Sequence, residues 1–446
     1  MNLLDLKNKT LGIISSYKDN CGNASYTRQL IEDFKTKFKK VECIELDQRL
    51  VHSDFHNLVK ANVLKKIQLY DFINVQFEPG LFHRKARKAF KFMEQILKIK
   101  NTNIAITFHS LSLSGEYSKI VNFSWLEYLL FKVKFRLKLL NRKDYNPYVL
   151  QQCFLLRKIK LNKFNHSNGI SIIVHNKKSA EQLAFLGVDS YFHPIVSANN
   201  SDIEKFNNDK IRNIILDKHN LSKDKTYIGC YGFYGPYKGV DLILKAMKHL
   251  PENFHLVMSS NCHPVSNLKI RNITTEKKNI TTENVEHIQY VEQNTYMIYL
   301  MDLIIKLNIS NRVHFTNHII DEDGFKELIA AMDVSVFPYY EVGQQGSGPI
   351  SYATHLNYSG KIILSRTNLF EMYEQDFFPD CFTFFDQGNY LELSQKIKNI
   401  KSKKMNLLKA RTKFNPNSNT KTYIDALLQN KDVSNFLNQS KVCNVE

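Results

Sequence analysis

Short apolar runs alternate with longer segments of helical periodicity along the first two hundred residues. The runs of strand length cover residues 11–16, 41–46, 71–77, 103–108 and 170–175. The helical patterns between them cover residues 25–38, 84–99 and 177–186. Strands that alternate with helices in this way predict a parallel sheet that carries helices on both faces.

The alternation stops at residues 197–224, which are polar and predict a connection between domains. Further apolar runs then cover residues 227–232, 254–259, 312–315, 334–338 and 361–365. Helical patterns cover residues 239–249, 296–307 and 323–331, and the polar stretch 261–295 predicts a surface insertion. We therefore predict an α/β chain of two tandem Rossmann-like, doubly wound domains over 1–196 and 225–417. Such sheets bind ligands beyond the carboxyl ends of their strands, so two of them that face each other form a cleft.

The loop GCYGFYGPYKG, residues 229–239, holds four of the 16 glycines of the chain and ends in Lys238-Gly239. It follows a predicted strand and precedes a predicted helix, which is the binding edge of such a sheet. Free N–H groups at a helix start, together with the charge of Lys238, form an anion site. The spacing matches neither a P-loop nor G-x-G-x-x-G, which argues against an ATPase or a dehydrogenase. The alternative interpretation is a tight turn with an exposed lysine.

A second glycine loop, EVGQQGSGPISYA (341–353), leads from another predicted strand into a helix that begins near Pro349. Its glycines are Gly343, Gly346 and Gly348. They let the backbone bend so that several N–H groups converge on one ligand. Glu341 at the entrance repels phosphate but accepts hydrogen bonds from sugar hydroxyls. Two such loops at strand ends of one domain indicate a phosphorylated, sugar-like ligand.

The first half offers weaker candidates at its own strand ends. Gly22-Asn23 forms a glycine turn after the first predicted strand, and His109 follows the strand ITFHS. Glu78, in VQFEPG, is placed in the same way. Two interpretations of His109 remain open. The histidine has a functional role at the edge of the cleft, or it makes a structural hydrogen bond at the end of its strand.

Charge adds one further candidate surface. Residues 132–163 contain ten Lys or Arg and one acidic residue, Asp144, with apolar residues between them. This composition is typical of a helix on an anionic membrane surface. The alternative is a solvated helix whose apolar face belongs to the core. No nucleic-acid-binding motif accompanies the segment, so we expect no nucleic-acid partner.

The cysteine pattern and the N-terminus bear on the compartment. Seven scattered cysteines without a C-x-x-C pair support neither a disulfide framework nor a zinc site. The N-terminus lacks the layout of a signal peptide, and no apolar stretch reaches the length of a spanning helix. We expect a cytoplasmic protein, with the inner face of the membrane as a peripheral location through 132–163.

GFYGPYKGVDLILKAM (232–247) and NRVHFTNHIIDEDGFKELIAAMDVSVFPYYE (311–341) resemble the nucleotide-sugar glycosyltransferases of GT-B fold, in particular glycosyltransferase family 4 (group 1). CGNASYT (21–27) and ITFHS resemble the first glycine loop and the cleft histidine of that family. The resemblance implies an N-terminal acceptor-side domain and a C-terminal domain that binds the donor nucleotide. It also implies that a helix at about 418–446 packs back on the first domain.

The resemblance implies a reaction as well: transfer of a sugar, with retention of configuration, from a nucleoside-diphosphate sugar to a hydroxyl of a glycan or lipid-linked acceptor. Departure of the diphosphate develops charge, which Lys238 and the N–H groups of 346–348 stabilise without a metal or a further cofactor. The residues expected to be catalytic are His109, Lys238 and Glu341. The residues expected to bind the donor are Gly22, Asn23, Gly235, Gly346, Ser347 and Gly348. Asp321-Glu322-Asp323 is expected to begin a helix, where acidic residues suit the helix dipole, and not to bind metal.

The sequence departs from the family at two positions. Phe233 stands where the family often has an arginine, and Pro349 or Tyr352 stands where it has a second glutamate. These departures put the identity of the donor in doubt and leave open a catalytically degenerate protein that acts as a scaffold. The net charge of +18 leaves open a polyanion-binding protein.

Overall fold

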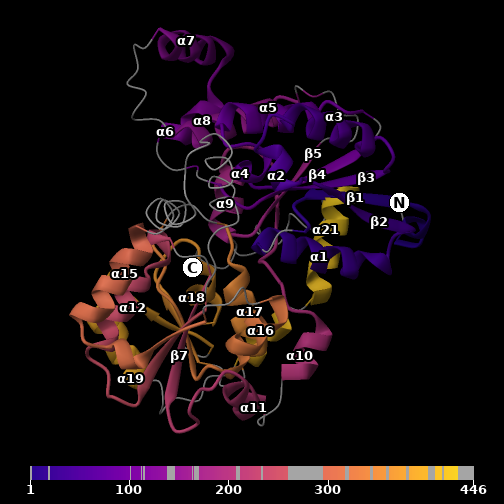
Figure 1. Ribbon diagram of the computed structural model, residues 1–446. Coiled ribbons are helices and arrows are strands. Elements are labelled where there is room, and N and C mark those ends of the chain that lie inside the picture. The colour runs from indigo at the N-terminus through magenta and orange to yellow at the C-terminus, as the bar shows by residue number, and fades with distance from the viewer. Residues whose placement is uncertain are drawn as a thin grey trace, which may run out of the picture.

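A computed structural model of the chain describes residues 3–18, 21–100, 102–111, 113, 116–137, 146–162, 164, 170–206, 211–232, 235–259, 295–316, 321–341, 345–357, 361–377, 381–399, 407–413 and 416–429. The described residues form two α/β sheets with helices between their strands, one in each half of the chain (Figure 1). The predicted insertion 261–295 lies outside them, apart from Thr295. Phe233, Gly343 and residues 430–446 also lie outside them.

The first sheet has six parallel strands in the order β2-β1-β3-β4-β5-β6. They are β1 (Thr10–Ser15), β2 (Lys40–Glu45), β3 (Phe72–Phe77), β4 (Asn103–Phe108), β5 (Ile170–Val174) and β6 (Tyr191–Phe192). The central strands are buried on both faces, which explains why they appear in the sequence as continuous apolar runs.

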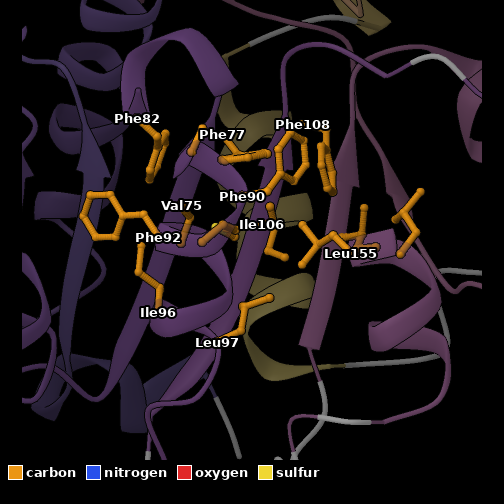
Figure 2. Packing of buried hydrophobic residues seen from close by; sticks show 14 of the residues in the cluster. Val75, Phe77, Phe82, Phe90, Phe92, Ile96, Leu97, Ile106, Phe108 and Leu155 are labelled. Carbon is orange, nitrogen blue, oxygen red and sulfur yellow. The ribbon is translucent and has the colours of Figure 1, made fainter. Parts of the chain in front are cut away.

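Helices cover both faces of this sheet. Most of them form a core on one face, in which aromatic side chains of β3 and β4 interdigitate with those of the helices (Figure 2). The helices on that side are α2 (Gln48–Val51), α3 (His56–Ile67), α4 (Pro79–Phe82), α5 (Ala86–Ile96), α6 (Glu116–Asn122), α7 (Trp125–Arg136), α8 (Pro147–Lys160) and α9 (Lys177–Phe185). The other face carries η1 (Leu3–Asn8), α1 (Gly22–Lys35) and α21 (Pro416–Leu428).

The helix α21 comes from the far end of the described chain, yet it packs against α1 and the first sheet (Figure 1). Tyr423 is fully buried there, and its hydroxyl group donates to Tyr26 at 3.3 Å and accepts from Thr107 at 3.3 Å. The chain therefore crosses from the first domain to the second and back again.

The second sheet repeats the arrangement, with six parallel strands in the order β12-β11-β10-β7-β8-β9. They are β7 (Thr226–Tyr231), β8 (Phe254–Ser259), β9 (Val313–Phe315), β10 (Val334–Phe337), β11 (Ile362–Ser365) and β12 (Thr383–Phe385). The helices are α10 (Asn200–Phe206), α11 (Ile211–Lys218), η3 (Pro236–Lys238), α12 (Val240–Met247), α15 (Thr295–Lys306), η4 (Ser310–Arg312), α16 (Glu322–Ala331), α17 (Gly348–Leu356), α18 (Glu371–Phe377), α19 (Tyr390–Asn399) and α20 (Leu408–Lys413). The prediction of two doubly wound α/β sheets in tandem is confirmed.

The polar segment 197–224, which is predicted as a linker, holds the helices α10 and α11. The first packs against α17 and the second against α16, so both lie on the second sheet's side of the molecule. Their apolar positions, such as Phe206 and Leu216, are too sparse among Asn, Asp and Lys to be recognised as a helical pattern.

Candidate functional site

In each sheet the strand order changes direction at one point: successive strands of the chain lie first on one side of the starting strand and then on the other. In the first sheet β1 lies between β2 and β3, and in the second β7 lies between β8 and β10. In doubly wound sheets the loops on either side of such a point form the ligand crevice. In the second sheet these are the loops that follow β7 and β10, and they contain both of the glycine-rich stretches.

Lys238 ends the loop after β7 and is buried, with 5% of its surface exposed. Its Nζ lies 3.8 Å from the centre of the Tyr339 ring and 5.0 Å from that of Tyr237. Burial lowers the pKa of Lys238 to about 7. Among the described residues no carboxylate lies within ion-pair distance of this Nζ, so two aromatic faces are its charge partners. An ammonium group held in this way is prepared for an anionic ligand.

Two glycines explain how the loop holds this lysine. Gly239 has φ +61°, and a Cβ there would lie 2.0 Å from the carbonyl oxygen of Pro338. Gly232 has φ +105°, and a Cβ there would lie 3.5 Å from Cε of Lys238 and 3.9 Å from Cγ of Pro349. The stem of Lys238 and the first turn of α17 therefore meet at Gly232, so the two predicted halves of the anion site are neighbours.

The start of α17 supplies backbone donors. Ser347 precedes the helix and does not cap it with its side chain, because its hydroxyl group pairs with that of Tyr339 at 3.1 Å. Gly348 is the first helical residue, and Pro349 follows with no N–H group to offer. The N–H groups of Gly348 and Ile350 belong to a first turn, which has no partner within the helix, and such groups bind anions.

The same loop joins the two domains through its backbone. The N–H of Gln345 donates to the carbonyl oxygen of His109 at 3.1 Å, and its side-chain Nε2 donates to that of Leu111 at 3.0 Å. A Cβ on Gly346 would lie 2.4 Å from Cδ1 of Ile195, a residue that packs with the first domain's core. The glycine at 346 therefore lets the loop pack closely against Ile195, whose side chain would have to move if residue 346 had a Cβ. Sequence patterns did not indicate Gln345, because its partners are carbonyl groups of a loop far away in the chain.

His109 follows β4 and is buried beside Gln76, whose Oε1 lies 2.7 Å from the histidine Nε2. Because a carbonyl oxygen accepts, Nε2 carries the proton and Nδ1 keeps its lone pair. Burial and the neighbouring ring of His175, 5.3 Å away between centres, hold the pKa of His109 well below its usual range. A neutral imidazole of this kind accepts a hydrogen bond from a sugar hydroxyl and brings no positive charge.

Gly22 and Asn23 lie at the start of α1, which begins at Gly22 and not near Ser25 as the sequence indicated. The side chain of Cys21, which directly precedes the helix, does not cap it, and a Cβ on Gly22 would have no described atom within 4 Å. The carbonyl oxygen of Asn23 accepts from the hydroxyl group of Thr27 at 2.7 Å. Among the described residues there is thus free space beside Gly22, in the segment that follows β1.

Glu341 and Gly235 are less closely tied to this arrangement. Glu341 is exposed, and its Oε2 accepts from the backbone N–H of Asn368 at 2.7 Å. Asn368 in turn accepts from Asn176 of the first domain at 2.6 Å through its carbonyl oxygen. The Glu341 carboxylate thus orders a loop at the domain boundary. Gly235 is extended, with φ −146°, a conformation that any residue adopts.

A polar cluster holds α1 of the first domain against α16 and α17 of the second. Arg28 donates to Glu322 at 2.9 Å, and the hydroxyl group of Tyr352 donates to the other carboxylate oxygen at 3.0 Å. Burial raises the pKa of Glu322, but the hydrogen bond from Arg28 and the charge of Lys326 lower it overall. Asp321 accepts a first-turn N–H of α16 at 2.8 Å, so the acidic string begins a helix as predicted. Tyr352, one of the two positions at which the resemblance would put a second glutamate, takes part in this interdomain contact.

Glu78 directly follows β3. Its carboxylate accepts a hydrogen bond from the hydroxyl group of Ser110. Burial raises the pKa of Glu78, although the hydrogen bonds from Ser110 and from the backbone of Gly80 oppose this shift. Burial, followed by the charge of Glu78, raises the pKa of Tyr237 to about 12, so the carboxylate lies near the loop that carries Lys238. Glu78 is therefore a candidate of the first domain whose charge acts on the lysine loop.

Comparison by sequence finds no matching protein family and no matching curated protein. Among solved structures, HepE of Anabaena in complex with UDP-glucose aligns with a TM-score of 0.59 and 11% identity, over 97% of this chain and 100% of that one. Sucrose-phosphate synthase of Thermosynechococcus elongatus gives 0.58 and 14%, over 97% and 100%. A glycosyltransferase of Rickettsia africae gives 0.55 and 13%, over 98% and 100%. At these identities the likeness establishes architecture: the chain has the two-domain α/β GT-B fold.

Proposed function

We propose that this protein is a glycosyltransferase that moves a sugar from a nucleoside-diphosphate sugar to a hydroxyl group of a glycan or lipid-linked acceptor. The observation that carries the proposal is the meeting of Lys238 with the first turn of α17 at Gly232. A buried ammonium group beside free backbone N–H groups fits a diphosphate. Structures of this fold that contain UDP or UDP-glucose, such as those of HepE, support the same class of donor.

In the proposed reaction the bond between the anomeric carbon and the diphosphate breaks, a bond to the acceptor oxygen forms, and the proton of the acceptor hydroxyl group passes to the departing diphosphate. Lys238 and the N–H groups of Gly348 and Ile350 stabilise the charge that develops on the diphosphate. Neutral His109 accepts a hydrogen bond from a hydroxyl group of the transferred sugar. The acidic residues Asp321 and Glu322 are engaged in a helix cap and an interdomain ion pair, so the proposal assigns the charge stabilisation to lysine and backbone and not to a metal. Retention of configuration, transfer of a hexose and independence of further cofactors belong to the same proposal, on the strength of the resemblance.

Thermal unfolding in the presence of sugar nucleotides tests the donor site. UDP-glucose is the first compound, followed by GDP-, ADP- and CMP-sugars. At 100 times its Kd a ligand that binds the folded state alone adds about 2.7 kcal/mol of stability. We therefore expect one nucleotide class to raise the Tm by several degrees, and to be hydrolysed slowly in the absence of an acceptor.

Two results would contradict this proposal. Binding of a sugar nucleotide without hydrolysis or transfer to any acceptor would support a scaffold of GT-B fold. Retention on heparin and on DNA with the same steep salt dependence, and no shift of Tm by any sugar nucleotide, would support a polyanion-binding protein.

Within this proposal Glu78 accepts a charge-assisted hydrogen bond from the acceptor hydroxyl group, which an ionised carboxylate binds more strongly than a neutral carboxyl group or an amide does. Glu78→Gln is expected to lower kcat/KM for the acceptor by about tenfold, the rate equivalent of about 1.4 kcal/mol. Because the pKa of Glu78 is raised, the wild-type rate should fall on acidification at a pH above the usual range of a glutamate, and the variant should lack this decline. Rates measured from pH 4 to pH 8 (roughly the window in which a raised glutamate titrates) test both points.

Glu32→Gln, on the exposed side of α1, is the matched control. It should keep the wild-type rate and the wild-type pH profile. An unchanged acidic decline in Glu78→Gln would remove Glu78 from the acceptor site and leave the donor assignment in place.

A further inference from the structure

The helix α7 carries an uncovered stripe of large apolar side chains. The six residues of the stripe are between 42% and 73% exposed: Trp125, Leu126, Leu129, Leu130, Val133 and Leu137, which directly follows the helix. At 100° per residue they fall within about 140° of the helix circumference, an arc that also contains the position of Arg136 at the end of the helix. Contiguous exposed apolar patches on a folded protein mark contact surfaces.

The opposite side of α7 is also apolar, and it is the side that holds the helix on the protein. Phe131 packs against Phe123 and Phe154, with ring centres 5.7 and 6.3 Å apart. Tyr128 packs edge-on against Phe154 at 5.4 Å. The exposed stripe is therefore not a core face that the fold has left unpaired, because the core face of α7 is already occupied. Something outside the described residues must cover the stripe if it is to be removed from water.

The charged residues of α7 are Lys132, Lys134, Arg136 and Glu127, so basic residues outnumber acidic ones around the stripe. Lys132 and Lys134 are exposed, and the helical angle places one at each edge of the stripe. The Nζ of Lys132 also lies 4.4 Å from the centre of the Tyr128 ring on the packed side of the helix. Glu127 is the acidic residue of α7, and it closes a capping box with Ser124, whose backbone N–H donates to it at 2.7 Å. The stripe thus has a cationic border.

The helix lies at the outer end of the first domain, beyond α6 and α8 and far from the second domain (Figure 1). It has 12 residues and spans about 18 Å, which is shorter than the hydrocarbon core of a bilayer. Within the described ranges no helix is long and apolar enough to cross a membrane. A short helix with Trp and Leu on one face and lysines at its edges is the form of helix that lies in a bilayer interface.

We infer that α7 is a membrane-docking helix, whose stripe inserts into the interface of a bilayer that contains anionic lipid. The cationic border selects this occupant, since a second copy docked on the same face would bring the same lysines together. The basic residues of α8 take no part, because Lys158 pairs with Glu94 and Lys160 with Asn122. The membrane-facing part of the predicted segment 132–163 is therefore its beginning, extended to Trp125. This inference does not rest on the sugar-transfer proposal.

The chain contains a single tryptophan, so the fluorescence of Trp125 reports on this face directly. The full-length protein is mixed with vesicles of phosphatidylcholine, with and without phosphatidylglycerol. We expect the emission to shift to shorter wavelength with the anionic vesicles, and lipids brominated in the acyl chain to quench it. Rising salt should weaken binding, because the electrostatic part is screened.

Leu126→Ser/Leu130→Ser is expected to lower binding in vesicle flotation by at least about tenfold, because two inserted side chains are lost. Lys132→Gln/Lys134→Gln should lower binding to the anionic vesicles alone. Leu69→Ser and Phe185→Ser are matched controls, since these side chains are 72% and 85% exposed elsewhere, and they should bind like the wild type.

Absence of any shift or quenching of Trp125 on anionic vesicles, in protein with a wild-type Tm, would overturn the inference. So would concentration-dependent self-association that Leu126→Ser/Leu130→Ser abolishes while vesicles do not bind. If no sugar nucleotide binds, the expected change in Trp125 fluorescence on vesicles stays the same. The test of membrane docking is therefore independent of the test of the proposed function.

Discussion

Replacing Lys238 with methionine is expected to lower the rate of sugar transfer by about 10²–10³-fold while the protein stays folded. The ammonium group is the buried cation beside the first turn of α17, so its loss leaves the departing diphosphate with backbone donors alone. Methionine keeps the volume of the stem and its contact with the Tyr339 ring. Steady-state transfer and donor hydrolysis both measure the loss. Lys248→Met, at an exposed position after α12, is the control and should keep the wild-type rate.

The stability of Lys238→Met provides a second readout. Folding lowers the pKa of this lysine from its usual value near 10.4 to about 7. Between these two pH values Lys238 is protonated in the unfolded chain and neutral in the folded chain. The free energy of unfolding of the wild type therefore rises with pH over this range. Below pH 7 the full penalty of the buried charge remains. The variant should therefore be more stable than the wild type at pH 6, and the difference should shrink toward pH 10 (about the value of a free lysine). A variant that loses both stability and activity at pH 6 would assign Lys238 to the structure and not to the reaction.

Tyr423→Ala is expected to destabilise the first domain by about 3–5 kcal/mol, the range for loss of a buried aromatic ring. The ring fills the core between α21 and α1, and its hydroxyl group joins Tyr26 and Thr107. Tyr423→Phe keeps the ring and removes the hydrogen bonds, which reduces the effect to about 1 kcal/mol. Urea denaturation followed by circular dichroism measures both changes.

Tyr299→Ala, at a half-exposed tyrosine of α15, should stay within about 0.5 kcal/mol of the wild type. Equal midpoints for the Tyr423 and Tyr299 variants would show that α21 adds nothing to the first domain. Tyr423→Ala should also weaken sugar transfer indirectly, because Gln76, which holds His109, bonds to the same hydroxyl group at 3.5 Å.

Much of the fold is predictable because parallel strands buried on both faces leave continuous apolar runs in the sequence. The strands β1, β3 and β4, and likewise β7 and β8, fall within a residue or two of their predicted bounds. The positions of the two glycine loops follow from these predicted strands. Each loop lies between the end of a predicted strand and the start of a predicted helix, which is the ligand-binding edge of such a sheet. The roles of their individual residues, including Lys238 and His109, remain predictions until the variants are measured.

The partners that shape the site are not predictable from local pattern. Tyr339 faces Lys238 from a different strand end, and Gln345 bonds to the backbone of a loop over 200 positions away. Neither contact produces a periodic or compositional pattern in the amino-acid sequence. The membrane helix shows a related difficulty, because charge defined the predicted segment from Lys132 onward. The apolar residues 125–130 look like core in the sequence, since both faces of α7 are apolar and sequence does not show which one is covered.

The return of α21 to the first domain has a consequence for synthesis. Domains generally fold as units in the order in which the ribosome releases them. Here the sheet face that includes Leu11, Phe72 and Ile173 stays without its second covering helix until residues 416–428 have been made. The second domain has all of its strands before that point, so it completes its core while the first still exposes apolar surface. The half of the protein that is made first is therefore the half that finishes folding last.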